Sequence, residues 1–159
     1  METETYLVRE FVLADLEQLY DLYDSLKSDD ISGIEPLCDN RTEEARLLDA
    51  YITNIYPLFE YGYWAVMSKE HQRIIGKIGF ANRELDGIIY TEMGYMIHRE
   101  FQQKGYGTEI CRNLIAKAYE LFGIIRLYCF IPVTNHVSCC FAEKLGFRTD
   151  KVPTVIMDN

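Results

Sequence analysis

The chain has 159 residues, of which 48% are hydrophobic and 26% are charged. This length predicts one domain over residues 1–159, and the apolar content excludes a disordered chain. The net charge of -9 repels phosphate backbones and anionic lipid, so it argues against nucleic acid and membranes as partners. No apolar run approaches the ~20 residues that a membrane span requires, and no leader pattern opens the chain, so a cytoplasmic protein is expected.

The cysteines are five in number, an odd count, and they include an adjacent pair but no C-x-x-C spacing. The histidines are widely separated and do not form a zinc-binding pattern. The sequence therefore predicts neither a disulfide framework nor a metal site, in keeping with a reducing compartment. The residues concerned are Cys38, Cys111, Cys129, Cys139, Cys140, His71, His98 and His136.

The first third of the chain predicts one strand and two helices. Residues 5–12 have the composition of a strand, and apolar residues at helical spacing predict a helix over 15–26. Asp15 and Gln18 have the spacing of a capping box at its start. After a loop over 28–40, a second helix is predicted to begin at Thr42 and to end at Pro57.

Three short runs rich in β-branched and aromatic residues follow, at 61–68, 73–80 and 88–97. Turn-forming residues separate them, including an Asp86-Gly87 pair that favours a hairpin. The runs predict an antiparallel meander. Within it, Tyr63, Trp64 and Phe80 are expected to fill the core beneath the sheet.

The last third predicts a helix over 105–122, a strand over 125–131, a helix over 135–145 and a final strand over 147–157. The segment 88–131 is a β-α-β unit, which requires a right-handed crossover if its strands are parallel. The fold class predicted is α/β (α+β): a mixed, mostly antiparallel central sheet with helices on both faces.

The loop at 102–108, Gln-Gln-Lys-Gly-Tyr-Gly-Thr, lies between a strand and a long helix. Gly105 and Gly107 allow the backbone to approach a ligand closely. The unpaired N–H groups and dipole of the following helix favour an anion such as a diphosphate, and Lys104 adds a positive charge.

Other nucleotide-binding patterns fit this loop poorly. A Rossmann fingerprint requires a third glycine where Ile110 stands, and a Walker loop requires Gly-Lys-Ser/Thr after the second glycine. A plain glycine-containing helix start is the remaining alternative for these residues taken alone.

Further motifs accompany the loop. Gln102, Gly105 and Gly107 match the signature [QR]-x-x-G-x-[GA], and the run 92–97 precedes it as a strand. Downstream, Asn135 and Ser138 are followed by Glu-Lys-Leu-Gly-Phe at 143–147. In these motifs and in the order of elements from residue 5 to about 157, the sequence resembles the GNAT superfamily of acyl-CoA-dependent N-acetyltransferases, closest to the branch of ribosomal-protein N-terminal acetyltransferases.

This resemblance implies a GNAT-like fold and acetyl-CoA as co-substrate, without a metal. It implies that the fourth and fifth strands splay apart and that the pantetheine arm lies between them. The residues that it assigns to cofactor binding are Tyr95, Met96 and Ile97 of the strand, Gln102, Gln103, Lys104, Gly105, Tyr106, Gly107 and Thr108 of the loop, and Asn135, Ser138 and Phe141 of the last helix. Asn135 is also a suitable N-cap in its own right.

The resemblance further implies direct attack of a primary amine on the thioester in a ternary complex. Glu92 is the candidate base, although a glutamate in a salt bridge would explain it equally well. Ala142 stands where many members have a tyrosine acid, so Ser138 is the candidate acid. The acceptor could be a peptide or protein α-amine, a polyamine or another small amine.

Two other classes of function remain open at this stage. The first is a CoA-binding protein without turnover, a sensor or assembly module, and the second is a purely structural or protein-binding module. Homodimers are common in the family, so the resemblance allows a homodimer, but the sequence itself does not show the oligomeric state. Tyrosines of the two N-terminal helices are candidates to flank an acceptor cleft: Tyr20, Tyr23, Tyr51 and Tyr56.

Overall fold

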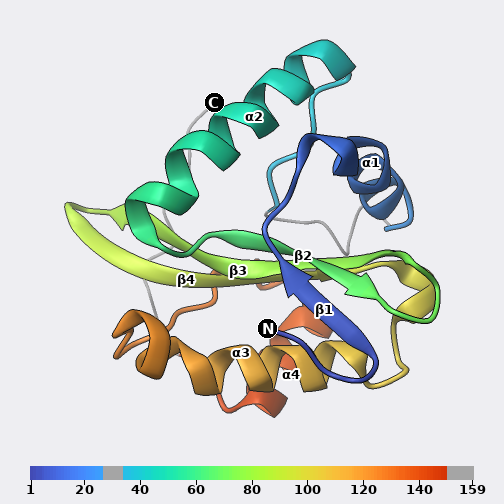
Figure 1. Cartoon of the computed structure of the whole chain (residues 1–159). Helices are drawn as coiled ribbons and strands as arrows, with labels where there is room; N and C mark the ends of the chain where they lie inside the picture. The colour runs from blue at the N-terminus through green and yellow to red at the C-terminus, as the bar shows by residue number, and fades with distance from the viewer. Residues whose placement is uncertain (27–33, 150–159) are drawn as a thin grey trace.

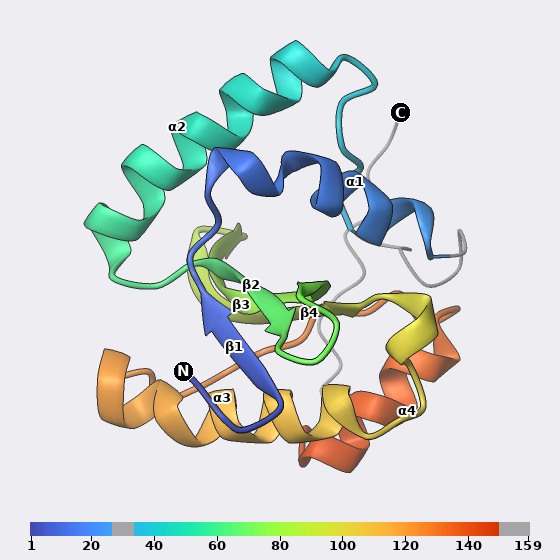
Figure 2. The same cartoon turned by 45° about the vertical axis from the view of Figure 1, so that its right-hand side comes forward.

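The computed structural model describes residues 1–26 and 34–149, and it places a sheet between two pairs of helices (Figure 1). Within these residues the sheet is antiparallel, in the order β1 (Tyr6–Arg9), β2 (Tyr63–Ser68), β3 (Arg73–Leu85), β4 (Ile88–Ile97). One face carries α1 (Leu16–Asp24) and α2 (Arg41–Phe59), and the other carries α3 (Tyr106–Phe122) and α4 (His136–Leu145) (Figures 1 and 2). The predicted fold class is confirmed.

The β3–β4 hairpin is longer than the sequence predicted. β3 continues to Leu85, so the turn expected over 82–87 contains only Asp86 and Gly87. Both have positive φ angles, 51° and 74°, as in the tight two-residue turns that match the twist of a hairpin. The extra length carries Arg83 alongside Tyr90 and into the neighbourhood of Glu92.

The capping box predicted for the first helix is wrong. Asp15 lies in a short 3-10 turn, its carboxylate pairs with Arg9 at 2.6 Å, and it accepts the N–H of Val12 at 2.9 Å. Gln18 turns away from the helix start, and its Oε1 accepts the N–H of Ile74 at 2.7 Å. Both side chains bond to other parts of the chain instead of capping α1.

The second helix begins as predicted but ends later. Asn40 caps it by accepting the N–H groups of Thr42 and Glu43 at 3.0 and 3.2 Å. Pro57 lies inside α2, which ends at Phe59 with Glu60 in the left-handed region. A proline disturbs the turn that precedes it, so two further residues can continue the helix.

The chain after α3 departs from the prediction in one important respect. The strand expected over 125–131 is reduced to a single parallel bridge between Tyr128 and Glu92. Beyond this bridge the chain diverges from β4 and finds no ladder of partners in the described structure. The final strand expected over 147–157 and the loop expected over 28–40 both lie partly outside the described residues.

Two apolar clusters hold the layers together. On the α3 side, Phe80 is 1% exposed and Trp64 stacks on Phe122 with ring centroids 5.7 Å apart, so these two core predictions are confirmed. The other cluster joins α1 and α2 to the sheet through Leu19, Leu22, Leu48 and Met96. Tyr63, also predicted for the core beneath the sheet, lines a pocket on the α2 face instead.

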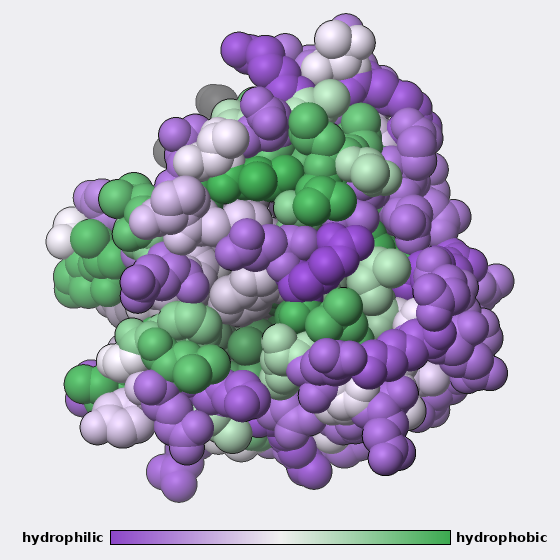
Figure 3. All heavy atoms as spheres, viewed as in Figure 1, coloured by the Kyte–Doolittle hydropathy of each residue, from purple (hydrophilic) through white to green (hydrophobic). Residues whose placement is uncertain are grey.

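The face seen in Figure 3 has a hydrophilic rim, with apolar side chains in the α1–α2 layer, along the α3 layer and at the tip of the β3–β4 hairpin. Ile88 and Ile89 at this tip are 55% and 69% exposed. None of the helices that the structure describes is both long and apolar enough to cross a bilayer.

Candidate active site

The outer edge of β4 is paired at one end and open at the other. The N–H of Met93 donates to the carbonyl of Tyr128 at 2.7 Å, and the N–H of Tyr128 donates to Thr91 at 3.0 Å. On the inner edge, the N–H of His98 donates to Ile75 of β3 at 2.8 Å. Because backbone groups alternate along a strand, odd-numbered residues of β4 face outward and even-numbered residues face β3.

Tyr95 therefore presents its N–H and its C=O to the open edge, where no described residue pairs with them. Ile97 faces the same way, and its carbonyl accepts the side-chain amide of Gln102 at 3.0 Å. Met96 faces β3 through its backbone, opposite Lys77, and its buried side chain packs on the α1–α2 side. Of the three strand residues assigned to the cofactor, Tyr95 and Ile97 have outward backbone groups and Met96 does not.

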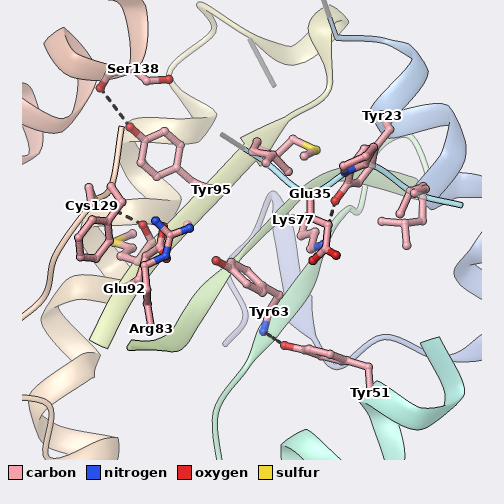
Figure 4. A pocket seen from close by; sticks show the side chains of 18 of the residues that line it. Tyr23, Glu35, Tyr51, Tyr63, Lys77, Arg83, Glu92, Tyr95, Cys129 and Ser138 are labelled. Atoms are coloured by element: carbon pink, nitrogen blue, oxygen red, sulfur yellow. Dashed lines mark hydrogen bonds and ion pairs between the residues drawn. The ribbon is translucent and has the colours of Figure 1, made fainter. Parts of the chain in front are cut away.

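A pocket of about 560 Å³ passes through the gap between β4 and the segment after Tyr128. Its lining includes five of the residues predicted for catalysis or cofactor binding: Glu92, Tyr95, Met96, Asn135 and Ser138. On the other side of the sheet it is lined by residues of α1, α2 and the loop before α2, among them Tyr23, Glu35 and Tyr51 (Figure 4). The pocket thus joins the two helical layers around the open edge of β4.

The glycine loop lies beyond the end of β4 and leads into α3. Gln103 and Gly105 have positive φ angles of 58° and 91°, which turn the backbone into the helix. Glu109 donates the first bond back to Gly105, so the N–H groups of residues 106–108 lie ahead of the helical ladder. A side chain at Gly107 would lie 3.5 Å from both Ile97 and Phe141. The loop amides and helix dipole suit a diphosphate.

The start of α4 faces the same gap. The Oδ1 of Asn135 accepts the N–H of Ser138 at 3.0 Å, so the predicted N-cap role is confirmed. The Tyr95 hydroxyl donates to the carbonyl of Ser138 at 3.2 Å, and the Tyr95 and Phe141 rings lie 4.9 Å apart. These contacts fix α4 against the open strand edge (Figure 4).

Glu92 lies where the gap begins, with a side chain that is 16% exposed. Burial raises the pKa of its carboxyl above the ordinary value, and the Arg83 guanidinium, 3.1 Å away, acts in the opposite direction. Arg83 also stacks over Phe130, 4.9 Å from the ring centre. The salt bridge with Arg83 confirms the alternative interpretation of Glu92, which also lines the pocket, and its role as a base stays a prediction.

Three tyrosines fix the wall opposite Glu92. The N–H of Tyr63 donates to the Tyr51 hydroxyl at 2.6 Å, and the Tyr56 hydroxyl donates to the Tyr63 carbonyl at 2.5 Å. The Tyr63 ring lies across Gly94, where an added Cβ would be 2.4 Å from its hydroxyl oxygen. Burial, and then the charge of Glu92, raise the pKa of Tyr63, so its hydroxyl is a neutral group near the carboxylate.

Sequence reasoning missed several lining residues. Lys77 and Arg83 stand in a strand with no local motif, and Tyr63 looks like any core aromatic. Cys129 lines the gap with its Sγ 3.5 Å from the Met93 carbonyl, and burial raises the pKa of its thiol to about 12. It is therefore a neutral thiol at ordinary pH. The alternation of β3, which places Lys77 and Arg83 on one face, could have pointed to these two.

Tyr23 and Tyr51 line the pocket, as proposed for the tyrosines of the first two helices. Tyr20 instead donates to the carbonyl of Cys38 at 2.5 Å, and Tyr56 is 6% exposed within the fold. Among the described residues, no three His, Cys, Asp or Glu side chains are grouped as metal ligands would be.

A sheet with helices on both faces, one open strand edge and a glycine loop leading into a helix define an acyl-CoA-type transferase fold. The chain belongs to the GNAT acetyltransferase family, whose acetyltransferase (GNAT) domain matches residues 6–148. The family predicted from the loop motif is therefore confirmed.

The similar proteins include members of the ribosomal-protein branch. A Bacillus subtilis (strain 168) protein named "Putative ribosomal N-acetyltransferase YdaF" is 39% identical over 57 residues, which are 36% of this chain and 31% of YdaF. The match thus spans about a third of that relative's length.

Two solved structures show the same fold at lower identity. The ribosomal-protein-S5-alanine acetyltransferase from Vibrio fischeri has a TM-score of 0.73 and 19% identity, covering 94% of this chain and 83% of that one. The microcin C7 self-immunity acetyltransferase MccE, in complex with acetyl-CoA and AMP, has a TM-score of 0.68 and 20% identity, covering 91% of this chain and 79% of that one.

Proposed function

We propose that this protein transfers the acetyl group of acetyl-CoA to a primary amine by direct attack in a ternary complex. The observation that carries the proposal is the pocket through the open edge of β4. It has Asn135 and Ser138 on one side, Glu92 and Tyr63 on the other, and the backbone of Tyr95 between them. The family membership and the fold shared with acetyltransferases support it.

The cofactor side is built largely from backbone groups. Tyr95 supplies an outward C=O and Ile97 an outward N–H for the pantetheine amides, which leaves the Tyr95 N–H for the thioester carbonyl. The amides of 103–108 and the α3 dipole receive the diphosphate, with Lys104 adding charge. Asn135, whose Oδ1 is used by the helix, has its side-chain NH₂ to donate toward the gap. Phe141 closes the site behind Tyr95.

Glu92 acts as the base in this proposal. An amine has a reference pKa of about 7.7–8.0 as an α-amine and about 10.4 as a lysine, so it must lose a proton before attack. A carboxyl whose pKa is raised by burial accepts a proton more readily than an ordinary one. Arg83 keeps the carboxylate ionised and oriented while Glu92 receives the proton, directly or through water.

The bond changes balance as follows. The amine nitrogen forms a bond to the thioester carbonyl carbon, the Tyr95 N–H stabilises the developing negative oxygen, and the carbon–sulfur bond breaks. The ammonium loses its first proton to Glu92 before attack, and the nitrogen loses a second proton as the intermediate collapses. The departing sulfur takes one proton from solvent, or from Ser138, which solvent then reprotonates, so the products are the N-acetyl amine and the CoA thiol. Ser138 lies on the first turn of α4 and lines the same pocket.

We further infer a cytoplasmic protein without nucleic-acid or membrane partners. All five cysteines are free thiols, which fits a reducing compartment, and the charge of -9 disfavours polyanions. The family supports a homodimer, which sedimentation velocity tests directly.

A thermal-shift measurement with acetyl-CoA tests the proposal first, with ATP and NADH as controls. At a hundredfold excess over Kd, binding adds about 2.7 kcal/mol of stability, which corresponds to a rise of roughly 5–10 °C in Tm. A thiol-release assay with a panel of primary amines then tests turnover. A shift without thiol release from any amine would favour a CoA-binding sensor or assembly module, and no shift would contradict both.

A further inference from the structure

The acceptor side of the pocket contains a cation, Lys77, beside two tyrosines. Lys77 is half-buried on β3, and its Nζ lies 3.0 Å from the Tyr23 hydroxyl oxygen. The same ammonium lies 5.4 Å from the ring centre of Tyr23 and 5.2 Å from that of Tyr63. Figure 4 shows this group on the side of the pocket away from Ser138 and Tyr95.

The ammonium of Lys77 has hydrogen-bond donors that are not used by the Tyr23 hydroxyl. It carries three N–H groups, and one phenol oxygen uses one of them. Of the carboxylates lining the pocket, Glu92 pairs with Arg83, and Glu44 accepts the N–H of Cys38 at 2.8 Å. Glu35, on the loop before α2, lines the pocket on the same side as Lys77 (Figure 4), but no ion pair joins the two side chains. In the described ranges, no carboxylate lies within ion-pair distance of the Lys77 Nζ.

A purely structural role explains only part of this arrangement. The Tyr23 hydroxyl accepts one N–H of the ammonium, and the Tyr63 ring lies close enough for a cation–π contact. They do not supply a counter-charge, and a charge withdrawn from water is costly unless it is paired. An anion brought by a ligand would provide the pairing and use the remaining N–H groups.

The position of Lys77 relates this cation to the proposed reaction. Lys77 lies opposite Met96, and Gly79 lies opposite Gly94 beside the open edge at Tyr95. Two residues along a strand correspond to about 7 Å. An acceptor anchored at Lys77 would therefore reach the edge with an amine a few bonds from its anionic group.

We propose that Lys77, Tyr23 and Tyr63 form a subsite for the carboxylate of the acceptor, so that the substrate class is a primary amine bearing a carboxylate. A free amino acid and a peptide with an acidic side chain near its N-terminus share this chemistry. A polyamine does not, because it would place a second ammonium against Lys77. The inference rests on the proposed acetyl transfer for the position of the amine.

Binding calorimetry with matched ligand pairs tests the subsite. The pairs are alanine against alaninamide, and the C-terminally amidated peptides Ala-Glu-Ala against Ala-Gln-Ala, with spermidine as a third class. Saturating CoA, which has no acetyl group to transfer, fills the cofactor side. The variants are Lys77→Met, Lys77→Arg and Lys144→Met, the last removing an exposed lysine of α4.

The wild-type protein and Lys144→Met should bind the carboxylate member of one pair at least about tenfold more tightly than its amide. Lys77→Met should abolish this preference, and Lys77→Arg should retain most of it. The pair that shows the preference identifies a free amino acid or a peptide as the source. The subsite is excluded if no carboxylate member binds more tightly than its amide, if spermidine binds best, or if Lys77→Met keeps the preference.

Turnover is measured separately with acetyl-CoA and the same ligands. A binding preference without thiol release would leave the subsite standing and contradict the proposed acetyl transfer. Thiol release at equal kcat/KM from both members of each pair would support the proposed acetyl transfer and contradict the carboxylate subsite.

Discussion

The two sides of the pocket are built in different ways. On the α3–α4 side, the groups predicted to bind the cofactor are mostly backbone: the outer edge of β4, the loop at 102–108 and the start of α3. On the α1–α2 side they are side chains that come together from distant parts of the sequence, such as Tyr23, Tyr63 and Lys77. The first side suits a ligand common to a family, and the second suits a ligand particular to one member.

Removing the proposed base, Glu92, which lies between the two sides of the pocket, should have the largest effect on activity. Glu92→Gln keeps the shape of the side chain but cannot accept a proton, so kcat should fall by at least about a hundredfold. The Kd for acetyl-CoA should stay unchanged. Steady-state kinetics and calorimetry measure the two quantities, with Glu84→Gln on the exposed part of the same hairpin as control. A variant as fast as the wild type would exclude Glu92 as the base.

Arg83→Met should change the pH dependence of kcat/KM, because it removes the cation that pairs with Glu92. The Glu92 carboxyl must be ionised to accept a proton, so activity falls as the pH falls through its pKa. Burial raises that pKa and Arg83 lowers it. Without Arg83 the pKa rises further, and the acidic limb of kcat/KM should move to higher pH. Arg46→Met, which breaks an exposed pair with Glu43, is the control. An unmoved limb would mean that Glu92 does not set it.

Tyr51→Phe should have the smallest effect. It removes the oxygen that accepts the Tyr63 N–H, which corresponds to about 1 kcal/mol of stability and a fall of roughly 2–4 °C in Tm. The KM for the acceptor should rise a few-fold while the Kd for acetyl-CoA stays constant. Tyr119→Phe, at a tyrosine that is 69% exposed, serves as control. A change in acetyl-CoA affinity alone would contradict the assignment of this wall to the acceptor.

Sequence reasoning succeeded where structure follows from local signals. Asn135 and Gly146 mark the ends of α4 because caps bond within a few residues. The loop at 102–108 is recognisable because its glycines and the helix start belong to one short segment. The loop and helix ends that are predicted to hold the cofactor could therefore be found from the sequence, while their binding role stays a prediction.

Sequence reasoning failed where the position of a side chain or strand depends on a partner far along the chain. Gln18 was expected to cap α1, but it bonds to Ile74 of β3. Residues 125–131 have the composition of a strand, yet only Tyr128 finds a partner on β4. The acceptor wall rests wholly on such distant contacts, which explains why Tyr63 was assigned to the core and Lys77 was overlooked.

The measurement that tests the central claim most directly is acetyl-CoA calorimetry on two matched glycine variants. Gly105 and Gly123 both have left-handed φ angles, 91° and 64°, and an added Cβ would meet no atom within 4 Å at either. Gly105→Ala and Gly123→Ala should thus carry similar backbone strain, of about 1 kcal/mol. Only Gly105 belongs to the loop whose amides we propose as the diphosphate site. We expect Gly105→Ala to raise the Kd for acetyl-CoA about tenfold and Gly123→Ala to leave it unchanged, whereas an unchanged Kd in both would contradict a cofactor side centred on this loop.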